Sequence, residues 1–239
     1  MEVQLRDELR AQTAGAQSTR ETYSGRCYSN EVLTALTSLV RTTDKLVLDI
    51  GCGNGANISN LRRRGHTVVG VTLSLAEAGE CERNGLACVV CDVAAAPLPL
   101  APASFDALIF SHVLEHMAYP EVVLRRCSSA LRAGGRVYVA LPNVMQLHQR
   151  LQFLKGRFRY TEMGVMDRTH LRFFDFVSAG RLLERAGFRV IYRGAVGHAP
   201  LRPLRKLLPV FCRTLDGVAS SLFPGLFGVH MIYIGERSE

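Results

Sequence analysis

The sequence predicts an α/β fold in which a mostly parallel sheet of seven strands carries helices on both faces. Seven short apolar segments rich in β-branched residues have the length of strands, and most of them alternate with segments of helical periodicity. A glycine-rich loop, Gly51–Gly55, follows the first strand. Strands joined by helical crossovers pair in parallel and are covered on both faces.

The first half of the chain supplies five of these strands. We expect them at 45–50, 67–72, 87–91, 105–110 and 136–141. Helices are expected at 57–64, 75–83 and 120–131, ending at Gly65, at Asn84-Gly85 and before the Gly134-Gly135 turn. Pro120 suits the first position of its helix, whereas the Ala/Pro-rich loop at 94–103 excludes regular structure. Ahead of these elements we expect a polar helix at 1–20 and a second helix from Asn30 to about Val40.

The second half departs from this alternation. Residues 142–170 form a long stretch of mixed aromatic and basic residues, and a helix at 177–186 and a strand at 188–193 follow it. The last strand is expected at 229–234. Some 35 residues separate the last two strands. They leave room for an added helical element.

The composition is that of an ordinary globular domain, with 48% hydrophobic and 21% charged residues among 239. No apolar run approaches the roughly 20 residues that span a bilayer, and the N-terminal segment MEVQLRDELRAQ lacks the apolar stretch of a secretory signal. We therefore expect a cytoplasmic location. The net charge of +8 comes almost entirely from Arg residues spread along the chain, with two local concentrations of basic residues, at Arg62–Arg64 and at Arg202, Arg205, Lys206 and Arg213. Solvated helix faces account for such a distribution, so we expect no nucleic-acid partner.

Seven cysteines are scattered through the chain, and Cys88 and Cys91 form a C-x-x-C. Such a pair can serve metal binding or redox chemistry. These two fall in an expected strand, where residues three apart point to opposite faces. We therefore expect reduced, mostly buried thiols.

Glycines at 51, 53 and 55 let the backbone turn tightly and approach a ligand without a Cβ in the way. A glycine pattern alone is also typical of nicotinamide and flavin sites. Two details favour a different cofactor. Asp49 ends the preceding strand, where a dinucleotide site has an apolar residue, and Thr72 stands where a ribose-binding acid is expected.

The segment VLDIGCGNG resembles the first motif of class I S-adenosylmethionine-dependent methyltransferases. Further segments match motifs of the small-molecule branch in the right order: VCDV at 90–93, PLAPASFDALIFSHVLEHM at 99–117 and LRAGGRVYVALPN at 131–143. The resemblance covers about residues 45–195. It implies a Rossmann-like sheet whose last strand is antiparallel, and a single domain over 1–239. Its expected parts are a helical cap (1–42), a cofactor-binding core (43–141), an acceptor lid insertion (142–176), and a C-terminal part (177–239) with a helical insertion at about 200–224.

The resemblance also implies S-adenosylmethionine as cofactor, with S-adenosylhomocysteine as product. Asp49 and the loop backbone would hold the methionine end, the ribose would lie near Thr72, and the adenine near Asp92. The full expected cofactor set is Asp49, Gly51, Cys52, Gly53, Gly55, Thr72, Leu73, Glu77, Asp92, Val93 and Ser111. Most relatives carry an acid where this chain has Thr72. VTLS at 71–74 resembles instead the second-strand motif of cyclopropane-fatty-acid-type methyltransferases, so Glu77 either substitutes for that acid or faces solvent.

Acceptors bind beyond the carboxyl ends of the strands, which selects Ser111, His112 and Asn143. His112, Glu115 and His116 also have a spacing that suits a metal ion. The LEH piece is common in methyltransferases that bind no metal, so we expect packing and helix capping there, and no metal. His112 is a candidate for an acceptor-facing group or base, with a structural histidine as the alternative.

The segment 167–174 resembles the "TH…kF" segment of ubiquinone-biosynthesis-type O-methyltransferases, which lies over the acceptor pocket. His170 is the first choice for general base, because an unperturbed histidine titrates near neutrality. The alternative is that Asp167, Arg168 and His170 only hold the lid by hydrogen bonds. The expected acceptor-binding set is His112, Asn143, Phe158, Tyr160, Arg168 and His170. Core packing explains the aromatic residues equally well.

Two segments have open roles. Tyr23, Arg26 and Tyr28 either close over the cofactor or belong to an ordinary surface loop. Leu201–Phe223 has apolar residues near helical spacing, with basic residues mostly on other faces. It could cover the acceptor pocket, form a dimer face or rest on an anionic membrane surface. Packing against the body of the protein is the leading expectation.

Together these features predict an enzyme that moves a methyl group from S-adenosylmethionine to a hydroxyl of a small molecule, such as a secondary metabolite, a sugar or a quinone-like compound. The expected mechanism is in-line displacement with a histidine base. The alternatives are N-methylation of an amine or peptide and a non-catalytic partner with a cofactor fold. Either a monomer or a homodimer is compatible with the sequence.

Overall fold

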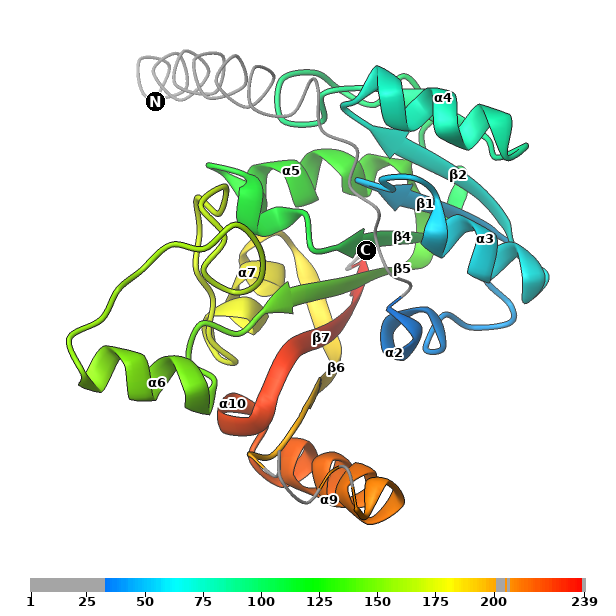
Figure 1. The fold of residues 1–239 in the computed structure, drawn as a ribbon. Helices are drawn as coiled ribbons and strands as arrows, with labels where there is room; N and C mark the ends of the chain where they lie inside the picture. Colours follow the sequence, from blue (N-terminus) through cyan, green and yellow to red (C-terminus); the bar gives the residue numbers. More distant parts are fainter. Residues whose placement is uncertain (1–32, 201–204, 206, 238–239) are drawn as a thin grey trace, which may run out of the picture.

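Seven strands form one sheet in the order β3-β2-β1-β4-β5-β7-β6 (Figure 1). The strands are β1 Leu46–Ile50, β2 Thr67–Thr72, β3 Cys88–Val90, β4 Phe105–Ser111, β5 Leu131–Pro142, β6 Phe188–Gly197 and β7 Gly228–Arg237. β7 is antiparallel to both β5 and β6, and the pairs from β3 to β5 are parallel. The predicted fold class is confirmed. The computed structural model describes residues 33–200, 205 and 207–237, so the expectations for 1–32, including Tyr23, Arg26, Tyr28 and the Asn30 cap, lie outside the described residues.

The helices in the described part of the chain are α2 Thr34–Thr37, α3 Ala56–Arg63, α4 Leu75–Arg83, α5 Pro120–Cys127, α6 Leu147–Leu154, α7 Ser178–Arg185, α9 Pro209–Leu222 and α10 Pro224–Phe227, with 3₁₀ turns η1 Leu114–His116 and η2 Ser128–Ala130. Three of the helices, α3, α4 and α7, match the predicted ranges to within one residue at each end. Ser74 caps α4 by accepting a hydrogen bond from the Glu77 amide. Pro120 and Pro209 each occupy a first helical position.

Alternating side chains of the central strands fill two hydrophobic cores, one on each face of the sheet. Leu48 and Ile50 of β1 pack with α5 and α7 in one core, whereas Val47 packs with α2, α3 and α4 in the other. The same alternation separates Leu108 from Ile109 in β4. Successive residues of a strand point to opposite faces, so a strand buried on both faces must be apolar throughout.

The Gly134-Gly135 segment was expected to be a turn before a strand, but β5 already begins at Leu131. Phe105 pairs with Leu131 and Ala107 pairs with Arg136, so the intervening residues bulge out of the β4–β5 ladder. The positive φ of Gly134, 69°, accommodates this bulge. Helix α6 also lies within a stretch for which the sequence predicted no regular element.

Helix α9 lies against β6, as expected for the segment 201–223, but most of the described residues of the predicted apolar face are not buried: Leu207, Leu208, Phe211 and Val218 are exposed, and Leu215 is half-buried. The buried side chains of α9 are Cys212, Asp216 and Ser220. Asp216 accepts a hydrogen bond from the Ala199 amide at 2.8 Å and pairs with Arg205 at 2.5 Å. These polar contacts attach α9 to the body and leave its apolar face exposed. No helix in the described part of the chain combines the length and apolar character of a membrane span.

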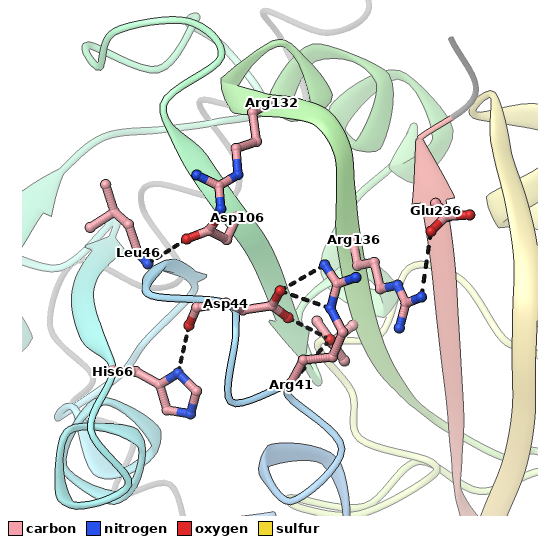
Figure 2. A network of polar contacts seen from close by, with 9 residues as sticks. Arg41, Asp44, Leu46, His66, Asp106, Arg132, Arg136 and Glu236 are labelled. Atoms are coloured by element: carbon pink, nitrogen blue, oxygen red, sulfur yellow. Dashed lines mark hydrogen bonds and ion pairs between the residues drawn. The ribbon is translucent and has the colours of Figure 1, made fainter.

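A polar network ties together the amino ends of the strands (Figure 2). Asp44 is 1% exposed, pairs with Arg41 at 2.7 Å and accepts a hydrogen bond from the Tyr138 hydroxyl at 2.7 Å. Asp106 accepts from the Leu46 amide at 2.8 Å and pairs with Arg132. Because each of these buried carboxylates has partners, this edge of the sheet is a structural clamp.

Candidate active site

The loop Gly51–Gly55 joins β1 to α3 at the carboxyl edge of the sheet. The amides of Gly51 and Cys52 donate to the carbonyl of Val71 at 2.7 and 3.0 Å. Gly51 and Gly55 have φ of 73° and 84°, and a Cβ on Gly51 would lie 2.3 Å from a methyl group of Val113. A side chain would therefore be strained and obstructed at Gly51.

Asp49 lies in β1 directly before this loop and has no exposed surface. Neither of its carboxylate oxygens has a hydrogen-bond partner among the described residues. Burial raises the pKa of Asp49 to about 7, and nearby Cys88 adds to the shift. Buried carboxylates without donors are rare and costly. This site therefore fits a ligand that brings its own donors.

Thr72 and Glu77 meet at the end of β2. The Thr72 hydroxyl donates to Glu77 Oε2 at 2.5 Å, and Glu77 is only 6% exposed. The alternative that Glu77 faces solvent is therefore wrong. The neighbouring Leu73 is half-buried. The structure thus brings an acid to the end of β2 from the following helix instead of from the strand itself.

Asp92 follows β3 and is held by a local turn. Its Oδ1 accepts hydrogen bonds from the amides of Ala94 and Ala95 at 3.0 and 3.3 Å. Its Oδ2 is buried without a partner in the described chain. Val93 beside it is buried, as is Ser111 at the end of β4. Asp92 therefore keeps one oriented acceptor atom available.

Two histidines nominated separately by the sequence converge on one carboxylate, that of Glu115 in η1. His112 Nδ1 lies 3.4 Å from Glu115 Oε1, and His170 Nε2 lies 4.0 Å from the same oxygen. Glu115 is 1% exposed. Its carbonyl accepts from the amides of Leu171 and Arg172 at 2.8 and 2.9 Å, which anchors the lid segment to η1.

The protonation states of this cluster follow from its contacts. Burial opposes ionisation of Glu115, but the hydrogen bond from His112 and the nearby histidines outweigh it, so the pKa of Glu115 is below its usual range. Burial lowers the pKa of His170. His170 Nδ1 lies 3.0 Å from the Val165 carbonyl, which can only accept. The neutral ring therefore carries its proton on Nδ1 and keeps the Nε2 lone pair.

His230 of β7 extends the cluster, and no motif pointed to it. Its Nδ1 lies 2.9 Å from His112 Nε2, and burial, followed by the proximity of His112, lowers its pKa to about 4. His112 itself has φ of 56°, a left-handed conformation that is strained for a residue with a side chain. Such strain persists only where the surrounding structure enforces it, as in many functional sites. A polar residue in the alternating last strand was the single sequence signal for His230.

Several expected acceptor residues lie elsewhere. Asn143 is 0% exposed, and its amide donates to Gly225 and Gly228 and accepts from Met145, so its side chain holds the insertions together and cannot reach an acceptor. Arg168 is exposed and pairs with Glu162. The contacts of Asn143 correct its assignment to the acceptor, whereas the assignment of Arg168 stays a prediction.

The lid aromatics form a chain that runs from the surface toward His170. Phe158 and Tyr160 are 56% and 53% exposed. Phe158 meets Phe173 with ring centroids 6.0 Å apart, and Phe173 meets His170 at 6.2 Å. Core packing therefore does not explain Phe158 and Tyr160. Both contact Phe173, which in turn contacts His170.

Two groups of side chains in the described residues have the ligand types and proximity for a metal ion: Cys52, Cys81 and Cys88, and Glu115, His116 and His170. Within each group the candidate ligand atoms lie within 4.8 Å of one another. Cys91 contacts the Pro97 carbonyl instead of Cys88, as expected for residues on opposite faces of a strand. The absence of a resident metal stays a prediction.

Comparison with known proteins places the chain in a family. Residues 24–193 match the family described as a methyltransferase domain. The chain is a class I S-adenosylmethionine-dependent methyltransferase. The methyltransferase is 27% identical over 171 residues to the ubiquinone biosynthesis O-methyltransferase of Chromobacterium violaceum, covering 68% of this chain and 72% of that protein.

Solved structures share the fold of the methyltransferase at low sequence identity. An S-adenosylmethionine-dependent methyltransferase from Mesorhizobium loti has a TM-score of 0.59 at 17% identity, covering 85% of this chain and 96% of that one. The 1,6-didemethyltoxoflavin-N1-methyltransferase of Burkholderia thailandensis, solved with its acceptor and S-adenosylhomocysteine, has a TM-score of 0.53 at 18% identity, covering 95% and 79%.

Proposed function

We propose that this methyltransferase methylates a hydroxyl group of a small quinone-like or phenolic acceptor, with His170 as the general base. The observation that carries the proposal is the convergence of His112 and His170 on the buried Glu115 carboxylate at the carboxyl edge of the sheet. A hydroxyl acceptor must lose a proton during methyl transfer, and a positioned base typically contributes about 10²–10⁴-fold to such a step.

The residues at the glycine loop fit S-adenosylmethionine, which supplies an electrophilic methyl group on its sulfonium when bound. Asp49 offers two unpartnered carboxylate oxygens to donors of the methionine end. The Thr72–Glu77 pair would accept from the ribose hydroxyls, and Asp92 Oδ2 would accept from the adenine amino group. Each of these atoms is a buried acceptor, and each position matches a polar donor of the cofactor.

His170 has the protonation state that a base requires. Its Nδ1–H faces the Val165 carbonyl, so the Nε2 lone pair is available. Glu115, 4.0 Å from Nε2, would stabilise the imidazolium that forms when this nitrogen takes the acceptor proton. His112 lies 3.4 Å from the same Glu115 oxygen, and His230 contacts His112 in turn. His112 is half-buried and is the second candidate to contact the acceptor.

The name of the Chromobacterium relative favours a ring hydroxyl as the methylated group. Methylation of an amine or a peptide is the alternative. The neutral His170 beside the Glu115 carboxylate favours a hydroxyl acceptor, which must lose a proton. A neutral amine already has a nucleophilic lone pair and needs no base before attack.

The test uses purified protein, calorimetry with S-adenosylmethionine and a panel of acceptors. We expect cofactor binding, and methyl transfer to catechols or hydroxyquinones that is at least tenfold faster than transfer to matched amines. Absence of cofactor binding at millimolar concentration would overturn the proposed chemistry. Transfer to amines alone would replace the hydroxyl assignment with N-methylation.

A further inference from the structure

Large apolar side chains on the surface gather in two segments of the methyltransferase. Of 17 such side chains exposed in the described part of the chain, 12 lie in residues 151–163 and 207–223. Leu154 and Met163 are 83% and 82% exposed, and Leu207 and Val210 are each 78% exposed. Exposed apolar residues are ordinary when single, but a concentration of this kind marks an interaction surface. We call these two segments the apolar rim.

Topology places both parts of the apolar rim at the same edge of the sheet as the candidate active site. β5 ends at Pro142 before one segment, and β6 ends at Gly197 before the other. Both strands are antiparallel to β7, so they end at the same edge. Arg150 of α6 donates to the carbonyl of Gly225 in α10, so the residues next to the two segments are in contact. In Figure 1, α6 and α9 both project from this part of the molecule.

The excess positive charge lies in the same part of the sequence, and the rim itself contains Lys155, Arg157, Arg159 and Arg213 against Glu162 and Asp216. Residues 142–227 contain 14 of the 29 Lys and Arg residues but five of the 21 Asp and Glu residues. The remainder of the chain has 15 basic and 16 acidic residues. Counted by region, one third of the sequence therefore carries the whole net charge.

Basic and apolar side chains alternate within the apolar rim. Lys155, Arg157 and Arg159 are exposed and interleave with exposed Phe158 and Tyr160. A hollow of about 330 Å³ opens there, lined by residues that include His148, Gln149, Arg157 and Arg159. Its described lining contains no acidic side chain. On α9, Phe211, Val218 and Leu222 recur at helical spacing on the exposed face, and exposed Leu207 precedes the helix.

We propose that the apolar rim docks the methyltransferase on an anionic membrane surface, so that its acceptor is an amphiphile taken from the bilayer. A lipid interface accommodates both kinds of side chain, since aliphatic and aromatic groups enter the acyl boundary while Lys and Arg meet anionic headgroups. The hollow beside Arg157 and Arg159 suits one such headgroup.

Other occupants fit less well. A second copy would bring two surfaces of the same positive charge together, which opposes association. A nucleic acid would satisfy the arginines but offers few partners to Leu154, Leu207 and Val210, since such interfaces are strongly polar. The statement about the acceptor rests on the proposed methyl transfer, whereas membrane docking does not.

The test is co-sedimentation of the full chain with vesicles of phosphatidylcholine alone or mixed with phosphatidylglycerol. We expect binding to the mixed vesicles, at least tenfold weaker binding to the neutral ones, and a loss of binding at high salt. Leu154→Glu with Phe211→Glu should reduce binding at least tenfold, and Arg157→Gln with Arg159→Gln should remove the preference for anionic vesicles.

Val177→Glu is the matched control, because Val177 is 55% exposed but lies outside the apolar rim. It should bind vesicles like the unmodified protein. Thermal unfolding and calorimetry with S-adenosylmethionine should show all variants folded and competent for the cofactor, and transfer to a water-soluble acceptor should be unchanged. No vesicle binding, equal binding by the rim variants, or a dimer that only these variants dissociate would each overturn the docking proposal. Tight, salt-sensitive binding of RNA that displaces vesicles would do the same.

Discussion

Buried carboxylates at the two edges of the sheet have opposite surroundings. At the amino edge, Asp44 and Asp106 are 1% and 2% exposed, and each is paired with an arginine. At the carboxyl edge, Asp49 is buried just as deeply, but its oxygens have no hydrogen-bond partner in the described chain. A paired buried acid holds the fold together, whereas an unpartnered one destabilises it. The comparison therefore separates residues that maintain the sheet from residues retained for a ligand.

Of the substitutions that test this difference between the two edges, Asp49→Asn should have the largest effect, which is on cofactor affinity. The substitution keeps the shape of the side chain but removes the charge that would accept from the methionine end of the cofactor. Hydrogen bonds to a charged group contribute about 1.5–3 kcal/mol, so we expect affinity for S-adenosylmethionine to fall about 100-fold. Calorimetry measures the change.

The stability of the same variant serves as its control. Because burial raises the pKa of Asp49 from 3.8 to about 7 in the folded protein, ionisation of Asp49 disfavours folding. The contribution of protonated Asp49 to stability is fully present below the unfolded-state pKa of 3.8. It is lost as the pH rises through the folded-state pKa of about 7. The unmodified protein without cofactor should therefore lose stability relative to Asp49→Asn as the pH rises from about 4 to about 7. A variant that is destabilised across this range would show that Asp49 holds the fold.

At the amino edge, Asp44→Asn should lower stability and leave cofactor affinity unchanged. It weakens the contacts with Arg41 and the Tyr138 hydroxyl in a buried setting. Arg41 is partly exposed, so the expected loss is about 2 kcal/mol of unfolding free energy, less than for a fully buried pair. Urea denaturation measures it. Cofactor affinity should stay within a factor of two of that of the unmodified protein. A larger loss of affinity would show that the amino edge also contributes to cofactor binding.

His170→Ala tests the base. We expect turnover to fall at least tenfold, with affinity for S-adenosylmethionine nearly intact, because His170 contacts the lid and Glu115 and not the glycine loop. Steady-state kinetics and calorimetry measure the two quantities separately. If both fall together, the histidine has a structural role in the lid.

The smallest expected effect is that of Glu115→Gln on the pH dependence of turnover. Burial lowers the pKa of His170, and the Glu115 charge opposes that shift. Without this charge the pKa of His170 falls further, so the acidic limb of kcat/KM should move to lower pH while the maximal rate falls several-fold. A pH–rate profile measures both. If the acidic limb does not move, Glu115 does not influence the group whose titration controls turnover. A profile restored in Glu115→Asp would confirm that a carboxylate is needed at this position.

The cofactor end of the site could be predicted because its determinants are local. Asp49, the glycines and Asp92 each lie at the end of a short strand, and the parallel sheet brings such ends to one edge. The helix boundaries at Ser74 and Pro120 were predictable for the same reason, since capping depends on neighbours in the chain.

The histidine cluster could be predicted only in pieces. His112 and His170 were selected for their positions in recognisable segments, but the carboxylate they share was expected to pack and cap a helix. His230 comes from a strand 118 residues away from its contact with His112. Contacts between side chains on paired strands that are distant in the chain cannot be predicted from the local sequence.

By itself, then, the sequence determined the sheet, the order of its helices and the cofactor loop, because hydrophobic periodicity and glycine conformation act over a few residues. Only the tertiary structure decided which polar groups are paired. Asp49 has no hydrogen-bond donor among the described residues, and Glu115 lies near two histidines. Asn143 hydrogen-bonds to the backbone of the C-terminal insertion instead of facing an acceptor. The tertiary structure also decided which face of α9 packs on the body: Cys212, Asp216 and Ser220 are buried, whereas Phe211, Val218 and Leu222 are exposed. Periodicity shows that a helix has two faces, and the contacts made by the rest of the chain decide which of them is buried.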